Sequence, residues 1–205
     1  MSKQTNINRI RAVAKALQSL NEEVVFVGGA TVTLYADQNT APESRPTDDV
    51  DVVVELASYA EFTKLDEQLR SIGFVNDANS SVICRYKIKG IIVDVMPTHP
   101  EILGFSNRWY PQGFKTAKEI SLEETAIKIF TLPYFIATKL EAFRSRGESE
   151  YRYSSDFEDI IYVLENRNLT FNELKNTTGN IRNYLEEQFR SFLKDPDFEE
   201  GLYAH

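Results

Sequence analysis

The stretch Thr47-Asp48-Asp49-Val50-Asp51-Val52-Val53-Val54-Glu55 decides the fold, because it places acidic residues at the start of a valine run. Side chains alternate between the two faces of a strand, so Asp49 and Asp51 point the same way. Val53 and Val54 make the remainder apolar on both faces, which is typical of a central, covered strand. The stretch therefore predicts a buried strand with two carboxylates on one face.

Two ionised carboxylates side by side repel each other and lose hydration, so a cation is expected to offset the cost. A divalent metal ion with oxygen ligands is one answer. The alternative is a strand end that exposes its two acids to solvent, and this short stretch alone does not separate the two interpretations.

A third carboxylate, Asp94, interrupts the later apolar run Ile91-Ile-Val-Asp-Val-Met96. Lys89-Gly90 before it is a hairpin signal, so we expect strands over residues 82–88 and 91–96. A charge inside an apolar strand is costly without a partner. Asp94 is therefore either a third metal ligand or the partner of Arg85 or Lys87 across the hairpin.

Length and composition limit the class of protein. The 205 residues, 42% hydrophobic and 26% charged, allow one domain with a substantial core or a domain with a helical appendage. The apolar runs are too short to span a bilayer and the start carries no signal region, so no membrane is expected. The net charge of −8 argues against a DNA partner, although a local basic patch could bind RNA. The single cysteine, Cys84, fits a reducing cytoplasm.

The pattern before the acidic strand suggests a phosphate site. An amphipathic helix is expected to end near Asn21, followed by a strand over 24–27, Gly28-Gly29 and a short helix over 31–37. Strand, double glycine and helix start present backbone N–H groups to a phosphate, although a double glycine is also typical of plain turns. Arg45, in a polar loop, can bind phosphate, brace an acid or lie in solvent.

The rest of the chain predicts more helix than strand. We expect a helix over 58–73 capped by Ser58, an irregular aromatic loop over 101–113 at the mouth of a site, and short strands within 119–130. A helix from Pro133 to Gly147 has Lys139 and Arg146 on one face. The helix from Ser154 or Ser155 carries Asp156 in its first turn, where capping would be a complete explanation for it. Further helices are expected over 170–174 and 181–193, and a frayed acidic tail from Asp195.

These elements predict an α+β fold: a small mixed β-sheet core packed with helices over residues 1–131, followed by a C-terminal helical region over 132–205. The order of Gly28-Gly29, Asp49-x-Asp51 and Asp94 resembles the DNA polymerase β-like nucleotidyltransferase superfamily. Several segments over about 24–164 further resemble the AbiEii/AbiGii group of abortive-infection nucleotidyltransferase toxins and their relatives: Arg45-x-Thr47-x-Asp49-x-Asp51, Val93-Asp94-Val95, Lys139-Leu-Glu-Ala142 with Arg146, and Ser155-Asp156-x-x-Asp159.

The resemblance implies a role for each matching residue. Asp49, Asp51 and Asp94 would ligate two Mg²⁺ ions, with Mn²⁺ as the alternative. Lys139 and Asp156 would join these three as catalytic residues. The nucleotide would be bound by Gly28, Gly29, Thr31, Arg45, Thr47, Lys139 and Arg146.

The implied reaction is attack of an acceptor hydroxyl on the α-phosphate of an NTP, with release of pyrophosphate. A tRNA end, a protein or a small molecule such as an aminoglycoside suits it as acceptor, and a toxin role would bring an antitoxin partner. The alternatives are a catalytically inactive binding or regulatory protein of the same fold, and an α/β interaction protein whose acids are surface features.

Overall fold

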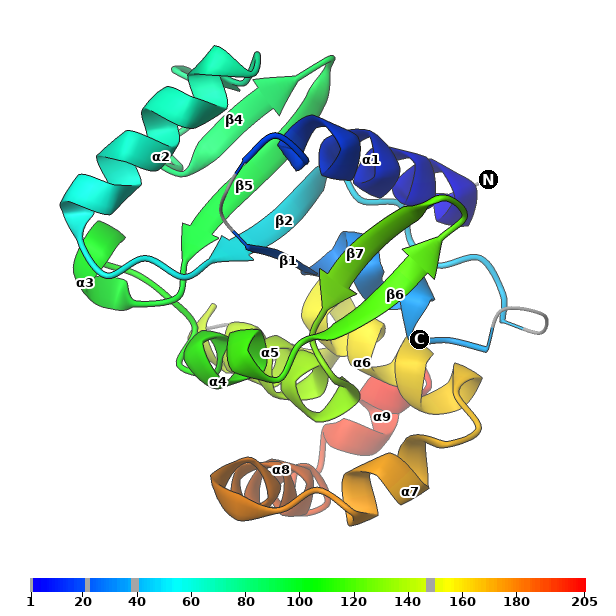
Figure 1. Cartoon of the computed structure of the whole chain (residues 1–205). Coiled ribbons are helices and arrows are strands. Elements are labelled where there is room, and N and C mark those ends of the chain that lie inside the picture. The colour runs from blue at the N-terminus through cyan, green and yellow to red at the C-terminus, as the bar shows by residue number, and fades with distance from the viewer. Residues whose placement is uncertain (1, 21–22, 38–40, 147–149) are drawn as a thin grey trace.

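A mixed β-sheet organises the chain in the computed structural model, which describes residues 2–20, 23–37, 41–146 and 150–205 (Figure 1). Its strands are β1 (Val24–Val27), β2 (Asp49–Val54), β3 (Val75–Asn76), β4 (Arg85–Ile88), β5 (Ile91–Pro97), β6 (Lys118–Leu122) and β7 (Thr125–Ile129). Their order across the sheet is β3-β4-β5-β2-β1-β7-β6. The pairs β1–β7 and β2–β5 are parallel, and the other neighbours are antiparallel.

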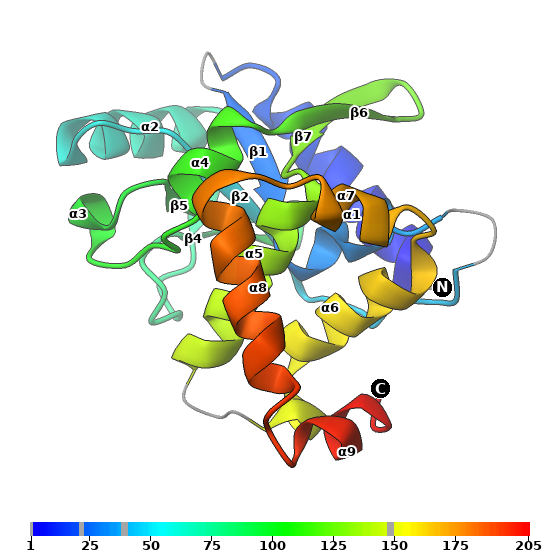
Figure 2. The same ribbon diagram turned by 90° about the horizontal axis from the view of Figure 1, so that it is seen from below.

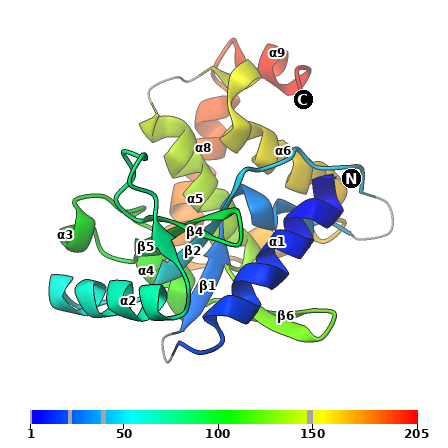
Figure 3. The ribbon, with the colours of Figure 1, turned by 90° about the horizontal axis from the view of Figure 1, so that it is seen from above.

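Helices pack on both faces of this sheet. The α-helices are α1 (Ser2–Leu17), α2 (Tyr59–Ser71), α3 (Pro100–Leu103), α4 (Tyr110–Lys115), α5 (Leu132–Ser145), α6 (Ser155–Asn166), α7 (Thr170–Lys175), α8 (Gly179–Phe192) and α9 (Phe198–Leu202), and short 3₁₀ helices are η1 (Gly29–Leu34) and η2 (Tyr151–Tyr153). Helices α1 and α2 lie over one face, and α4 and α5 lie on the other (Figures 1 and 3). No helix of the described ranges is both long and apolar enough to cross a membrane.

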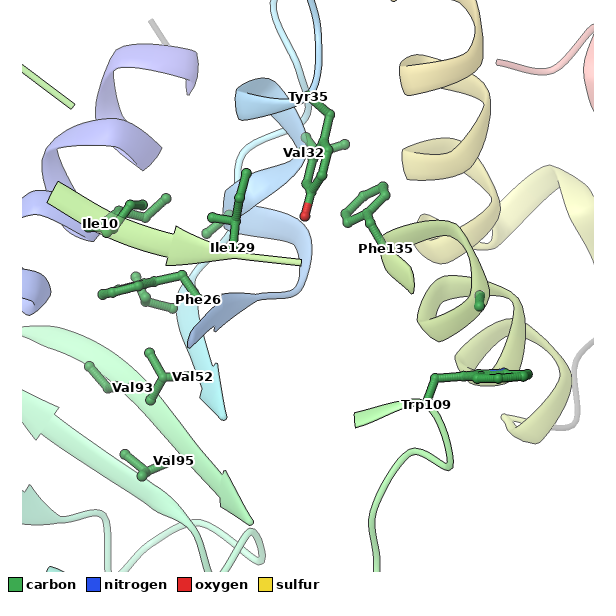
Figure 4. Packing of buried hydrophobic residues seen from close by; sticks show 14 of the residues in the cluster. Ile10, Phe26, Val32, Tyr35, Val52, Val93, Val95, Trp109, Ile129 and Phe135 are labelled. Carbon is green, nitrogen blue, oxygen red and sulfur yellow. The ribbon is translucent and has the colours of Figure 1, made fainter. Parts of the chain in front are cut away.

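The two faces of the central strands differ in chemistry because side chains alternate along each strand. Phe26, Val52, Val93 and Val95 are buried on the face toward α1, where Ile10 packs (Figure 4). The opposite face carries the three carboxylates and the side chains of Val25, Val27 and Val53, which form a second apolar cluster with Phe114 of α4 and Phe130 after β7. The acidic residues therefore stand at the edge of an apolar patch.

Most expected elements are present, with shifted bounds. The strand over 24–27, the acidic strand and the hairpin at Lys89-Gly90 are confirmed, although β4 begins at Arg85 and not at residue 82. Ser58 caps α2 by accepting a hydrogen bond from the N–H of Glu61. The N-terminal helix ends at Leu17, and the expected end near Asn21 lies outside the described residues, as does Gly147.

Two expectations were wrong. Residues 101–113 are not one irregular loop, because α3 and α4 form there, each with a proline in its first turn, where the missing N–H costs nothing. The tail from Asp195 is not frayed. Tyr151 donates its hydroxyl to Asp195 at 2.6 Å, and α9 brings Gly201 against the ring of Tyr151.

The C-terminal helices share an aromatic core. Rings of Phe143, Tyr151, Phe157, Phe192 and Phe198 contact one another, with Phe192 and Phe198 stacked at 5.3 Å. In Figure 2, which views the molecule from below, α5, α6 and α8 lie in front of the sheet, and α9 lies at one end of them. This core holds together α5 and α6, which carry Lys139, Asp156 and Asp159.

Candidate active site

Three carboxylates meet at the centre of the sheet because the strand register aligns them. Asp51 on β2 pairs with Asp94 on β5 and, on its other side, with Val27 at the end of β1. Asp49 is two residues earlier on the same face of β2. Each of the three offers an oxygen within 4.8 Å of those of the other two. We call Asp49, Asp51 and Asp94 the acidic trio.

Arg85 is bound to two members of the trio. It lies opposite Asp94 across the β4–β5 hairpin. Its Nε and Nη2 donate to the two carboxylate oxygens of Asp94 at 2.8 and 2.7 Å, and Nη2 also donates to Oδ2 of Asp49 at 3.0 Å. The ion pair between Arg85 and Asp94 that the sequence raised as an alternative is therefore present.

Asp51 is the member of the trio that no cation within the described ranges contacts at ion-pair distance. Burial and repulsion from Asp49 and Asp94 raise the pKa of Asp51 to about 7, while Lys139 and Arg146 act in the opposite direction. The charge of Asp51 is thus poorly compensated, and a further cation would be favoured beside it.

The glycine turn lies directly against the trio. Gly28 has φ of +73°, and a Cβ at this position would lie 1.9 Å from Oδ2 of Asp51. Only glycine combines this backbone conformation with such a close approach. Thr31 is fully buried and donates its hydroxyl to the carbonyl of Gly28 at 2.8 Å, so its side chain holds the turn.

Helices α5 and α6 contribute a chain of ion pairs that we call the helix network. Arg45 donates from Nε and Nη2 to the two oxygens of Asp159, both at 2.9 Å. Lys139 bridges Asp159 at 2.6 Å and Asp156 at 3.0 Å. Arg146 completes the network by donating to Asp156 at 2.7 Å. The order is therefore Arg45, Asp159, Lys139, Asp156, Arg146.

Burial differs along this network. Lys139, Asp156 and Asp159 are buried, whereas the side chain of Arg146 is 69% exposed. Burial alone would lower the pKa of Lys139, but the two carboxylates outweigh it and raise that pKa, so the amine stays charged. Ser154 caps α6, so Asp156 has partners of its own and is not the cap.

The predicted nucleotide-binding residues differ in what their side chains contact. Gly29 packs on the guanidinium of Arg45, since a Cβ there would lie 2.4 Å from Nη2. Thr47 is buried and donates its hydroxyl to Asn6 of α1 at 3.1 Å. This hydrogen bond connects the start of the acidic strand to α1. Lys139 of α5 and Arg146, which directly follows α5, face the same side, as expected, because both contact Asp156.

Sequence reasoning assigned no site role to Arg85 or Asp159. The hairpin offered Arg85 only as a neutralising partner of Asp94, and the contact with Asp49 requires knowing that β2 pairs with β5. Asp159 was part of the motif in α6, but its links to Arg45 and Lys139 cross 114 and 20 positions of the chain. Only the tertiary fold brings these groups together.

Similarity to individual known proteins is found by comparison of structures. No protein-family model matches the chain, and no curated protein sequence matches it significantly. Its structure is similar to that of an antigenic nucleotidyltransferase-like protein from Paracoccidioides brasiliensis, with a TM-score of 0.57 and 20% identity over 100% of this chain and 94% of that one.

Two structures of ANT(2'')-Ia are also similar. The solution structure of this antibiotic-resistance factor gives a TM-score of 0.56 at 13% identity, over 95% of this chain and 97% of that one. The crystal structure in complex with adenylyl-2''-tobramycin gives 0.53 at 13% identity, over 90% and 99%. The chain therefore has the α+β fold of nucleotidyltransferase-like proteins, which confirms the fold expected from the acidic strand.

Proposed function

We propose that this protein is a divalent-metal-dependent nucleotidyltransferase that moves an NMP from an NTP to an acceptor hydroxyl. The observation that supports the proposal most strongly is the acidic trio against the turn of Gly28, at the centre of a nucleotidyltransferase-like fold. Two adjacent strands and a turn bring these groups together.

The donor set fits Mg²⁺, and also Mn²⁺, because all three candidate ligands are carboxylates and one of them, Asp51, lacks a cation partner within the described residues. Asp49, Asp51 and Asp94 would hold two ions. Ions bound there would offset the charge of the triphosphate and lower the pKa of the attacking hydroxyl.

The chain's own groups would bind and orient the donor. Backbone N–H groups at Gly28 and Gly29 would face the phosphates, and the exposed guanidinium of Arg146 would add a positive charge. Lys139 would act on the phosphates through its charge, while Asp156 would hold both cations in place. In the reaction the acceptor oxygen would form a bond to the α-phosphorus, the bond to pyrophosphate would break, and the hydroxyl proton would pass to water with the help of the charge of Asp94.

We further propose a small molecule as the acceptor. The net charge of −8 disfavours a large nucleic-acid surface, and one structurally similar protein was solved with an adenylylated small molecule, adenylyl-2''-tobramycin. A toxin role with a tRNA or protein acceptor and an antitoxin partner rests on the sequence resemblance.

We also propose residues 1–131 as the catalytic core and residues 132–205 as the helical region that supplies most of the helix network.

The first test is a thermal-shift titration with each of the four NTPs, with and without Mg²⁺. A rise in melting temperature that requires both Mg²⁺ and one particular NTP is expected, and it would identify the donor. That NTP, labelled on its α-phosphate, would then be offered with aminoglycosides, tRNA and protein extract. Metal-dependent binding without transfer to any acceptor would favour the catalytically inactive alternative, and no shift with any NTP would contradict the proposal.

A further inference from the structure

Arg85 holds the same carboxylates that a metal ion would need. Its Nη2 lies 2.7 Å from Oδ2 of Asp94 and 3.0 Å from Oδ2 of Asp49, so one nitrogen bridges two of the three candidate ligands. Its Nε occupies the other oxygen of Asp94 at 2.8 Å. The bidentate fork is the strongest arrangement that a guanidinium and a carboxylate form.

The charges, like the distances, indicate that Arg85 and a metal ion conflict at the trio. The trio carries three negative charges when ionised, and Arg85 returns one positive charge. The Arg85 side chain is 24% exposed and the Asp94 side chain only 10%, so solvent screens their interaction little. A divalent ion arriving at Asp49 and Asp94 would meet a fixed cation within a few ångströms and would be repelled by it.

We propose that Arg85 competes with the divalent ion for Asp49 and Asp94, so that metal binding requires the guanidinium to withdraw from the trio. The inference rests on the proposed metal site, and it adds a residue that sets the metal affinity of the free protein. The nucleotide favours the exchange, because its phosphates bring negative charge for both the ion and the displaced Arg85. Metal and nucleotide therefore bind cooperatively, and the metal alone binds weakly.

A neighbouring lysine supplies a matched control. Lys87 lies two residues further along β4 and so points to the same face, but it pairs with Asp77 at 2.9 Å and not with the trio. Arg85→Met and Lys87→Met each remove one positive charge from the same strand. Only the first removes it from the candidate metal ligands.

The experiment measures Mn²⁺ binding by the loss of the free-ion electron paramagnetic resonance signal, for wild type, Arg85→Met, Arg85→Lys and Lys87→Met. In the absence of nucleotide, Arg85→Met should bind Mn²⁺ about tenfold more tightly than wild type or more, because a unit charge and a divalent ion a few ångströms apart repel by that much even in water. Arg85→Lys should be intermediate, since one ammonium cannot form the fork, and Lys87→Met should match wild type. Thermal melts in EDTA identify any variant that fails to fold. If Arg85→Met fails, Arg85→Lys is compared with wild type instead.

A non-hydrolysable analogue of the preferred NTP is added in a second series. It should tighten Mn²⁺ binding more in wild type than in Arg85→Met, because the variant has no guanidinium to displace. Equal or weaker Mn²⁺ binding by a folded Arg85→Met would overturn the competition and show that Arg85 instead orients Asp94 for the metal. That result leaves the proposed function intact if wild type binds Mn²⁺ with the analogue, whereas no binding by any variant, with or without the analogue, would overturn both.

Discussion

The helix network and the acidic trio are both clusters of charged side chains, and they differ in how their charges are balanced. The helix network has three cations for two carboxylates, and each carboxylate contacts two cations. The trio has three carboxylates and, among the described residues, Arg85 as its cation. A cluster in which every carboxylate contacts cations is complete as it stands, whereas a cluster with a carboxylate that lacks a cation partner is expected to bind something of opposite charge.

Two cations of the helix network differ in role although both are basic residues. Lys139, which we propose to act on the phosphates through its charge, has its amine buried between Asp156 and Asp159, so its charge would act over a distance and not by contact. Arg146, at the end of the same network, is the exposed cation. The network therefore supports the site from the side of α5 and α6 and presents one guanidinium to solvent.

The largest expected effect comes from removing the charge of the trio. Asp49→Asn combined with Asp51→Asn should lower nucleotidyl transfer at least about a thousandfold, because several kcal/mol of metal-derived charge stabilisation is lost. The double variant should fold at least as stably as wild type, since it relieves repulsion. Asp48→Asn, which removes an exposed acid one position away, is the control and should transfer normally. Transfer that survives the double substitution would exclude the trio as the metal site.

The helix network should respond to the loss of a charge in the opposite way, by becoming less stable. Lys139→Met leaves two buried carboxylates short of a partner and should lower the free energy of unfolding by about 3–5 kcal/mol, measured by urea denaturation. The matched control is Lys128→Met, because Lys128 forms an exposed pair with Glu23 and its loss should cost less than about 1 kcal/mol. Similar losses in the two variants would show that the helix network is not a cooperative unit.

The pH dependence of stability tests the unbalanced charge of Asp51 directly. The fold raises the pKa of Asp51 to about 7 from an ordinary value of 3.8. Between about pH 4 and pH 7 Asp51 is therefore ionised in the unfolded chain but still protonated in the folded one, so the free energy of unfolding of the wild type falls as the pH rises through this range. Asp51→Asn does not titrate, so in EDTA its stability advantage should grow over this range and level off above it. At about 1.4 kcal/mol per pKa unit, the upper limit is on the order of 4 kcal/mol. An advantage that is the same at pH 4 and pH 8 would contradict the raised pKa.

The smallest effect on folding is expected at the exposed end of the network. Arg146→Ala should change the free energy of unfolding by less than about 1 kcal/mol, because its side chain is 69% exposed and Asp156 keeps Lys139. It should nevertheless weaken NTP binding about tenfold, the usual contribution of a charged hydrogen bond. Arg152→Ala removes another exposed arginine, paired with Glu200, and should leave NTP binding unchanged. Equal NTP affinity in the two variants would remove Arg146 from the donor site.

Much of the sheet could be predicted because its signals are local. Alternation of valine and aspartate, a double glycine after a strand and a Lys-Gly hairpin each depend on neighbouring residues, and β1, β2, β4 and β5 follow from them. The trio could be predicted for the same reason, since two of its members are two residues apart. Its neutralisation by Arg85 was foreseen for Asp94 but not for Asp49.

The features that were missed depend on contacts between distant segments. Asp195 and the acidic residues after it gave an expectation of fraying, but Phe198 and Gly201 pack against the aromatic core around Tyr151, and this outweighs the local charge. Asp159 forms ion pairs with Arg45 and Lys139, and the spacing of residues within α6 gives no indication of these partners. Sequence periodicity identifies which face of a helix is polar, but not which polar groups meet.

The position of the trio in the strand order has a consequence for motion. Strands β2 and β5 lie side by side in the interior of the sheet, with β1 and β4 hydrogen-bonded to their outer sides. Their amide protons can exchange with deuterated water only after neighbouring ladders open, whereas β3 and β6 at the edges exchange more readily. Asp51 and Asp94 lie within these doubly paired stretches, so their backbone is expected to exchange slowly, whereas Asp49 lies beyond the part of β2 that pairs with β1. Rearrangement at the trio is then expected to come from side chains such as Arg85.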